Sequence, residues 1–204
     1  MLTACDFLDE YNPNSVTVGN YYTSEEDIVA SLNGVYTSLT QSYVADNYHY
    51  FTDVRANATV VTNSGANSGI PYQFYNYTLT EENVYVYNRY SQLYKIISRA
   101  NTLFAHLGDV SYATPSARDT YEAEARFLRA LSYYWLVTEW GDVPLVLKVL
   151  ESTEEVRANN YRRPKAEIYQ AIFDDLKYVT ESPLLDVQPA SACGKVCLLY
   201  TSPS

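Results

Sequence analysis

Residues 122–140 read E-A-E-A-R-F-L-R-A-L-S-Y-Y-W-L-V-T-E-W, and this stretch decides the fold. Its apolar and aromatic side chains recur at spacings of three and four residues, which predicts a long α-helix. A helix that is apolar on two faces has neighbours on two sides. We therefore expect the segment around Phe127 and Trp135 to be enclosed between stacked helices. The two apolar stripes are Tyr121, Ala125, Leu128, Leu131 and Trp135, and Phe127, Ala130, Tyr134 and Val137.

The same spacing rule predicts three more helices, so the predicted fold class is all-α. The first follows a T-x-x-E capping pattern at Thr23 and Glu26, and Gly34 on its flank is expected to let another helix approach closely. The other two span about residues 82–107 and 164–182, and the quoted helix itself spans about residues 114–140. Residues 143–150 are expected to be extended, and residues 151–160 to form a polar linker. In domain terms, we expect an extended lead-in over 1–22, a helical domain over 23–182 and an unstructured tail over 183–204.

Residues 43–83 interrupt the helical frame with a long, irregular and aromatic-rich excursion. Tyrosine and phenylalanine alternate here with asparagine, glycine and proline, and no steady period of 3.6 or 2 residues is present. An irregular stretch of this length inside a compact domain usually serves a function. We interpret it as an ordered excursion from the helices, in which a short helix near residues 43–51 would fit.

Composition excludes one class of partner and points to another. Fourteen basic and 24 acidic side chains give a formal net charge of −10, and no basic stripe is present that could follow a phosphate backbone, so nucleic acid is not expected as a partner. Tyrosine occurs 22 times. A tyrosine offers a flat apolar face and a polar tip, which suits sugar rings, although packing between helices uses the same side chain.

The sequence contains none of the common catalytic or phosphate-binding motifs, and we predict neither an enzyme nor a cofactor. Two histidines and three cysteines are too few and too scattered for a metal site. The acidic pairs, including Glu122 with Glu124 and Asp174 with Asp175, are interpreted as solvated helix faces. Glu122 and Arg126 are expected to form a local ion pair one helical turn apart.

The quoted helix and the residues after it resemble a known family. The run E-A-R-F-L-R-A from Glu124 to Ala130, followed by G-D-V-P-L from Gly141 to Leu145, resembles the SusD/RagB family of outer-membrane nutrient-binding lipoproteins. Cys5-Asp6-Phe7-Leu8-Asp9 is similar to that family's mature start, and the helix containing Leu32-Asn33-Gly34-Val35-Tyr36 is similar to its first helix. The resemblance extends over residues 5–182 and covers only the N-terminal portion of a typical member.

The resemblance implies a fold, a location and partners. Family members are built on tetratricopeptide-like helix pairs in an α-α superhelix, although no clean 34-residue repeat is present here. They are anchored in the outer membrane by a lipidated cysteine, which would be Cys5, and are exposed at the cell surface. They associate with a SusC-like TonB-dependent transporter and bind oligosaccharides, or in some members peptides, without cleaving them. The tail after Pro183 departs from the family pattern, and one hypothesis is that it is not native sequence.

A sugar presents C–H groups that stack on aromatic faces and hydroxyls that need both donors and acceptors, which asparagine supplies together. The leading hypothesis is therefore non-catalytic oligosaccharide binding at the excursion for delivery to a transporter. A helical-repeat scaffold for protein interactions and the capture of peptide instead of glycan remain alternatives. The candidate ligand contacts in the excursion are Asn63, Asn67, Tyr72, Phe74, Tyr75 and Tyr77.

Overall fold

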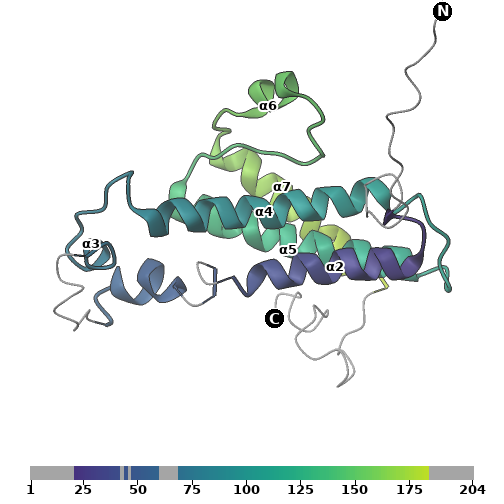
Figure 1. Ribbon diagram of the computed structural model, residues 1–204, viewed down its shortest axis with the longest axis horizontal. Helices are drawn as coiled ribbons and strands as arrows, with labels where there is room; N and C mark the ends of the chain where they lie inside the picture. Colours follow the sequence, from purple (N-terminus) through teal and green to yellow (C-terminus); the bar gives the residue numbers. More distant parts are fainter. Residues whose placement is uncertain (1–20, 42–43, 46, 60–68, 184–204) are drawn as a thin grey trace, which may run out of the picture.

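The quoted helix is α5 (Ala117–Trp140), and it lies at the centre of the helical stack (Figure 1). It packs most extensively against α7 (Lys165–Glu181) and α4 (Val84–His106), while α2 (Glu25–Leu39) contacts both α4 and α5. The predicted helix with neighbours on two sides is thus confirmed. The computed structural model describes residues 21–41, 44–45, 47–59 and 69–183.

The buried positions of α5 include small side chains as well as large ones such as Leu128, Tyr133 and Leu136. Ala123, Ala125 and Ala130 are almost completely buried, whereas Phe127 and Trp135 are only partly buried and Tyr134 is 49% exposed. Alanines allow neighbouring helices to approach closely, so the bulky aromatic rings lie at the edges of the contacts. The prediction of an enclosed helix was right. Most aliphatic members of the expected stripes are buried, namely Ala125, Leu128, Ala130 and Val137, whereas their aromatic members lie nearer the surface than expected.

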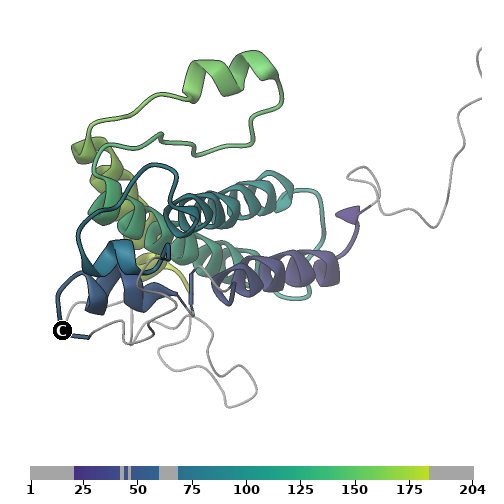
Figure 2. The same cartoon turned by 60° about the vertical axis from the view of Figure 1, so that its left-hand side comes forward.

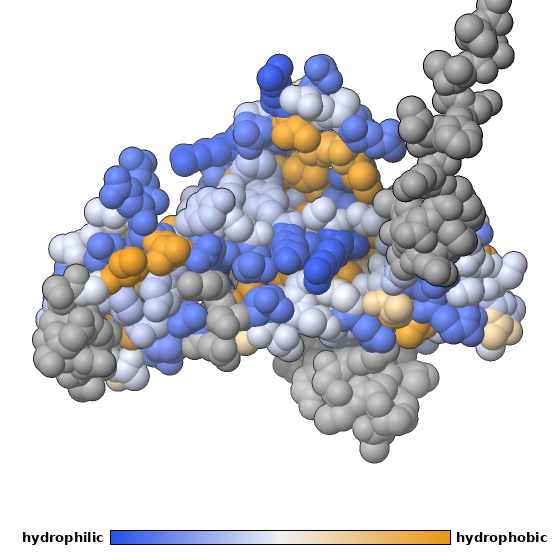
Figure 3. Space-filling view, viewed as in Figure 1, coloured by the Kyte–Doolittle hydropathy of each residue, from blue (hydrophilic) through white to orange (hydrophobic). Residues whose placement is uncertain are grey.

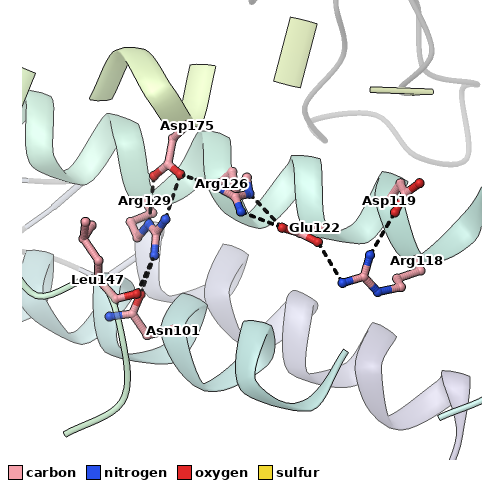
Figure 4. Close-up of polar contacts among 8 residues, drawn as sticks. All are labelled: Asn101, Arg118, Asp119, Glu122, Arg126, Arg129, Leu147 and Asp175. Carbon is pink, nitrogen blue, oxygen red and sulfur yellow. Dashed lines mark hydrogen bonds and ion pairs between the residues drawn. The ribbon is translucent and has the colours of Figure 1, made fainter. Parts of the chain in front are cut away.

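A network of buried charges joins the helices (Figure 4). Arg129 on α5 makes a two-pronged contact with Asp175 on α7, with N–O distances of 2.7 and 2.8 Å. Its remaining nitrogen donates to Asn101 Oδ1 on α4 at 2.7 Å and to the carbonyl of Leu147 at 3.2 Å. Arg126 extends the network, because it contacts Asp175 at 2.9 Å and forms the expected ion pair with Glu122 at 2.7 Å.

This network corrects the interpretation of the acidic pairs as solvated faces. Glu122, Glu124 and Asp175 are 7%, 3% and 2% exposed. Glu124 accepts a hydrogen bond of 2.7 Å from the Tyr36 hydroxyl on α2, and the other two acids bind arginine. Sequence spacing could place these acids on a helix, but it could not show that arginines from the same and neighbouring helices would cover them.

The chain after α5 leaves the stack as an anchored arm, visible in Figure 2. Gly141, with a φ of 74°, ends α5 in a left-handed conformation that glycine adopts at little cost. Residues 143–150 are extended, as expected, and side chains of the stack hold their carbonyls. Asn101 donates to Val146 and Lys148, Tyr94 donates to Pro144, and Tyr133 donates to Val146. Burial raises the pKa of Tyr94 and of Tyr133 above the usual range, so both hydroxyls keep the proton they donate.

Three local predictions were wrong. Residues 151–160 contain a helix, α6 (Thr153–Asn159), in place of the expected linker. Ser152 caps it, because its Oγ accepts from the Glu155 amide. None of the residues of α6 is buried, so the sequence shows no apolar stripe there. The capping box of α2 pairs Ser24 with Asp27, one residue later than the pair expected. Outside α2 itself, no atom of the described residues lies within 4 Å of the position of a Gly34 Cβ, so the expected close helix approach there is not seen; the Gly34 carbonyl accepts from Arg99 on α4 at 2.7 Å.

Within the described ranges, no helix has the length and apolar character required to cross a bilayer.

A second buried charge fixes the aromatic end of the molecule to the helical stack. Arg89 on α4 is fully buried and makes a two-pronged pair with Glu139 on α5, at 2.6 and 2.7 Å. Its guanidinium carbon lies 4.8 Å from the ring centres of both Tyr48 and Phe51, and 5.4 Å from that of Trp135. It also donates to the carbonyl of Val44. One side chain therefore binds the helices and the residues of the excursion at once.

We predict that Asp175→Ala lowers the free energy of unfolding by about 3–5 kcal/mol, because it leaves the buried Arg129 without its carboxylate. Urea denaturation followed by circular dichroism measures this change. Asp174→Ala is the matched control. The Asp174 carboxylate is exposed and, among the described residues, accepts one hydrogen bond, from Gln170. We expect its loss to change the free energy of unfolding by no more than about 0.5 kcal/mol. Equal effects of the two substitutions would contradict the role given to the network.

We also predict that Arg89→Met destabilises the protein by about 3–5 kcal/mol, and that Arg89→Met combined with Glu139→Leu costs less than Arg89→Met alone. Removing one partner leaves a charge in a largely buried place, whereas removing both leaves none. The same denaturation experiment, run as a double-mutant cycle, checks this. Arg157→Met, on the exposed helix α6, serves as the control and should change stability little. Additive effects in the cycle would show that the two side chains are not coupled.

Candidate functional site

The described part of the excursion forms a small aromatic unit at one end of the molecule, beside the first turn of α4 (Figure 1). It contains a π-helical turn, η1 (Tyr50–Val54), and a short helix, α3 (Tyr72–Tyr75). A short helix near residues 43–51 was expected, and the observed turn lies slightly later. Phe51, Val54 and Phe74 form a hydrophobic cluster of their own, separate from the core of the stack. The excursion is thus ordered by a core that belongs to it.

Asn83 joins this unit to the first turn of α4. Its side-chain oxygen accepts from the amides of Tyr85 and Val86, which caps the helix. Its side-chain nitrogen donates to the Ile70 carbonyl at 3.1 Å and to Gln73 Oε1 at 2.8 Å. The residue is only 1% exposed, so all these bonds are made away from water. This single amide fixes α3 relative to α4.

Three of the six predicted ligand contacts lie on the surface of the unit. The rings of Tyr72 and Tyr75 lie 5.5 Å apart and both are partly exposed, while Tyr77 is 63% exposed. Phe74 is 0% exposed, because its ring packs against Phe51 at 4.9 Å in the hydrophobic cluster on which Tyr75 also packs. The other predicted contacts, Asn63 and Asn67, lie outside the described residues, as do Cys5 and the tail from residue 184 onwards.

Tyr77 has a strained backbone. Its φ of 57° lies in the left-handed region, which costs a residue with a side chain about 1–2 kcal/mol. Two bonds hold the conformation: the Tyr77 hydroxyl donates to the Arg55 carbonyl at 2.8 Å, and the Thr78 amide donates to the Gln73 carbonyl at 3.0 Å. Strained residues of this kind gather at binding sites, where the surrounding structure maintains them.

A pocket of about 160 Å³ lies between the aromatic unit and the helical stack. Sequence reasoning missed it, because Glu139 and Trp140 were interpreted only as the end of a helix. A tryptophan beside a carboxylate at a helix end was the one signal available. The pocket is lined by Phe51, Arg55, Leu79, Thr80, Val86, Glu139 and Trp140.

A second hollow lies under the arm that carries α6, and it differs in chemistry. Its walls are mainly apolar, and in Figure 3 apolar side chains gather beneath the α6 arm. Val156, Leu147 and Val149 are 46%, 45% and 37% exposed there. Aliphatic side chains form a larger part of this lining than of the pocket at Glu139 and Trp140. Its walls are formed by Tyr94, Ile97, Ser98, Asn101, Val146, Lys148, Val149, Leu150 and Val156.

The described residues contain no group of three or more histidine, cysteine, aspartate or glutamate side chains placed to hold a metal ion. The arginines and acids that come together in the stack are paired with each other, as the Arg129–Asp175 and Arg89–Glu139 contacts show. The candidate site therefore consists of exposed tyrosines beside a small aromatic and polar pocket, an arrangement suited to binding.

Curated relatives are similar over most of this chain. A SusD-like protein (P2) of Formosa agariphila is 27% identical over 181 residues, which is 88% of this chain and 35% of that protein. A SusD-like protein of Bacteroides ovatus is 25% identical over 196 residues, or 89% of this chain and 33% of that protein. The chain thus spans about a third of the length of these relatives.

Solved structures share the fold. A laminarin-binding SusD-like protein superposes with a TM-score of 0.73 and 26% identity, covering 86% of this chain and 38% of that one. The surface glycan-binding protein A of Bacteroides thetaiotaomicron, in complex with laminarihexaose, gives a TM-score of 0.70 at 20% identity, over 87% of this chain and 37% of that one. The all-α, tetratricopeptide-like architecture expected from the resemblance is confirmed by these neighbours.

The model of one protein family matches residues 6–185 and is described as "starch-binding associating with outer membrane". This description names the binding of a polysaccharide and names no reaction, in agreement with the prediction of a protein that is not an enzyme. The match runs through all four long helices and the aromatic excursion. The chain belongs to the SusD-like family.

Proposed function

We propose that this chain forms part of an oligosaccharide-binding site whose surface is the aromatic unit beside the first turn of α4. The observation that carries the proposal is the exposed group of Tyr72, Tyr75 and Tyr77, held in place by its own core and by Asn83. Asn63 and Asn67, in the same excursion, are proposed to add hydrogen bonds to sugar hydroxyls. Phe74 contributes as part of the buried cluster and not as a direct contact.

The physical basis is that the tyrosines are already in position before a ligand arrives. A rigid aromatic side chain supplies a large contact area and loses little conformational entropy on binding. The phenols of Tyr72 and Tyr75 also offer hydroxyls that can donate to and accept from a sugar, while the Tyr77 hydroxyl, which donates to Arg55, can still accept. A surface of partly exposed tyrosines fixed on a small core therefore suits a flexible glycan better than a loop that must be ordered during binding.

Relatives support this choice of ligand class. Starch binding in the family description, laminarin binding by one structural neighbour and the laminarihexaose complex of another all concern neutral glucose polymers. The description also names association with the outer membrane. We extend this to a surface-exposed protein anchored through a lipid on Cys5, which delivers its glycan to a SusC-like TonB-dependent transporter.

We predict that Tyr72→Ala combined with Tyr75→Ala weakens the binding of laminarihexaose or maltohexaose by about tenfold or more, which corresponds to about 1.4 kcal/mol. Both rings lose their contact area with the sugar, while Phe74 and the underlying cluster remain. Isothermal titration calorimetry with each hexasaccharide measures the change.

A double variant of two exposed aromatics elsewhere provides the control for this experiment. Tyr161 and Phe173 are 47% and 61% exposed and lie outside the excursion, so Tyr161→Ala with Phe173→Ala should leave affinity unchanged. Wild-type affinity in the Tyr72/Tyr75 variant, with an unchanged circular dichroism spectrum, would rule out the tyrosine surface as the binding site. If the wild-type chain bound neither hexasaccharide, the proposed function itself would be rejected.

A further inference from the structure

We propose that the pocket between the aromatic unit and the helical stack binds one pyranose unit of the glycan. The pocket is lined by side chains from three parts of the chain: Phe51 and Arg55 in and after η1, Thr80 and Val86 around the start of α4, and Glu139 with Trp140 at the end of α5. This inference rests on the proposed function, and it adds a second contact region that does not depend on the exposed tyrosines.

The lining combines the two kinds of surface that a sugar ring requires. Trp140 and Phe51 offer aromatic carbon, and their ring centres lie 6.3 Å apart at an angle of 44°. Glu139, Thr80 and Arg55 add an acceptor, a hydroxyl and a donor on the same pocket wall. Binding pockets for small molecules are typically built in this way, from apolar and aromatic walls with a few fixed polar groups.

The polar wall of the pocket is held in advance. Glu139 is paired with the fully buried Arg89 through both carboxylate oxygens, which fixes the plane of the carboxylate. A carboxylate has about four acceptor positions, and Arg89 takes one on each oxygen, so acceptor capacity remains for sugar hydroxyls. The same arginine lies against Phe51 and thereby fixes the aromatic wall as well. Groups held by their neighbours bind without an ordering cost.

The pocket wall suits a ligand that presents hydroxyl groups. The Glu139 carboxylate is paired with Arg89, and Arg55 adds a guanidinium to the lining. Sugar hydroxyls can donate to the carboxylate in a charge-assisted hydrogen bond.

Tyr77 connects the tyrosine surface to residues of the pocket lining. The Tyr77 hydroxyl donates to the carbonyl of Arg55, a residue that lines the pocket, and only Thr78 and Leu79 separate Tyr77 from Thr80 in the chain. A glycan lying across Tyr72 and Tyr75 would therefore meet the pocket mouth beyond Tyr77. The two regions would contact neighbouring units of one oligosaccharide, so their contributions to affinity should be separable by substitution.

The test uses a tryptophan inside the pocket. The chain contains two tryptophans, Trp135 and Trp140, so Trp135→Phe leaves Trp140 as the only one. In this background, saturating laminarihexaose should shift the Trp140 emission and protect it from quenching by acrylamide. Thr80→Phe fills the pocket mouth from an exposed position, and we expect it to weaken binding about tenfold or more and to abolish the emission change. Thr180→Phe, at an exposed threonine at the end of α7, is the control and should do neither.

The outcomes separate this inference from the function on which it rests. If laminarihexaose binds the Trp135→Phe chain without altering Trp140, or binds the Thr80→Phe variant with unchanged affinity, the pocket is not a sugar site and the tyrosine surface alone explains binding. If the wild-type chain binds no hexasaccharide, both proposals fail. A loss of binding in Thr80→Phe counts in favour only when its thermal unfolding matches that of the control variant, and a matching loss in the control would overturn the assignment.

Discussion

The ion pair between Arg129 and Asp175 is the constraint on which the rest of the structure depends. It lies almost entirely out of water and joins α5 to α7, while the third nitrogen of Arg129 reaches Asn101 on α4 and the carbonyl of Leu147 on the arm. A buried charge is stable only when its hydrogen-bonding groups are satisfied, so these elements have one arrangement in which all partners are present. The α5 alanines allow the close approach that such short contacts need.

A second buried ion pair, between Arg89 and Glu139, lies where the aromatic unit meets the helices. Arg89 is buried between Glu139, Tyr48, Phe51 and Trp135, so the site is joined to the stack by a charge that cannot be exposed without cost. The hydrophobic cluster around Phe74 then orders the outer part of the unit. The helical stack provides a rigid support, the excursion provides the exposed aromatic side chains, and Arg89 contacts both.

The proposed binding surface needs no reactive group. Fixed tyrosines offer flat faces, and the neighbouring pocket offers aromatic walls with a fixed carboxylate, a hydroxyl and a guanidinium. Affinity in such a site comes from several moderate contacts that are in place before binding, so loss of any one weakens the interaction without abolishing it. This fits a family described by polysaccharide binding.

Periodicity alone was sufficient for the long helices, because burial of one helix face imposes a spacing of three and four residues that is visible in the sequence. Residues 143–150 were also predicted correctly, since their apolar run carries no helical period. Helix α6 was missed because a short helix without a buried face leaves no such pattern. The buried states of Glu122, Glu124 and Asp175, the inward position of Phe74 and the pocket at Trp140 were decided only by tertiary structure. The Glu122–Arg126 pair follows from the local i, i+4 spacing, but the other surroundings, such as Arg129 opposite Asp175, come from elements far apart in the chain, and no local pattern encodes them.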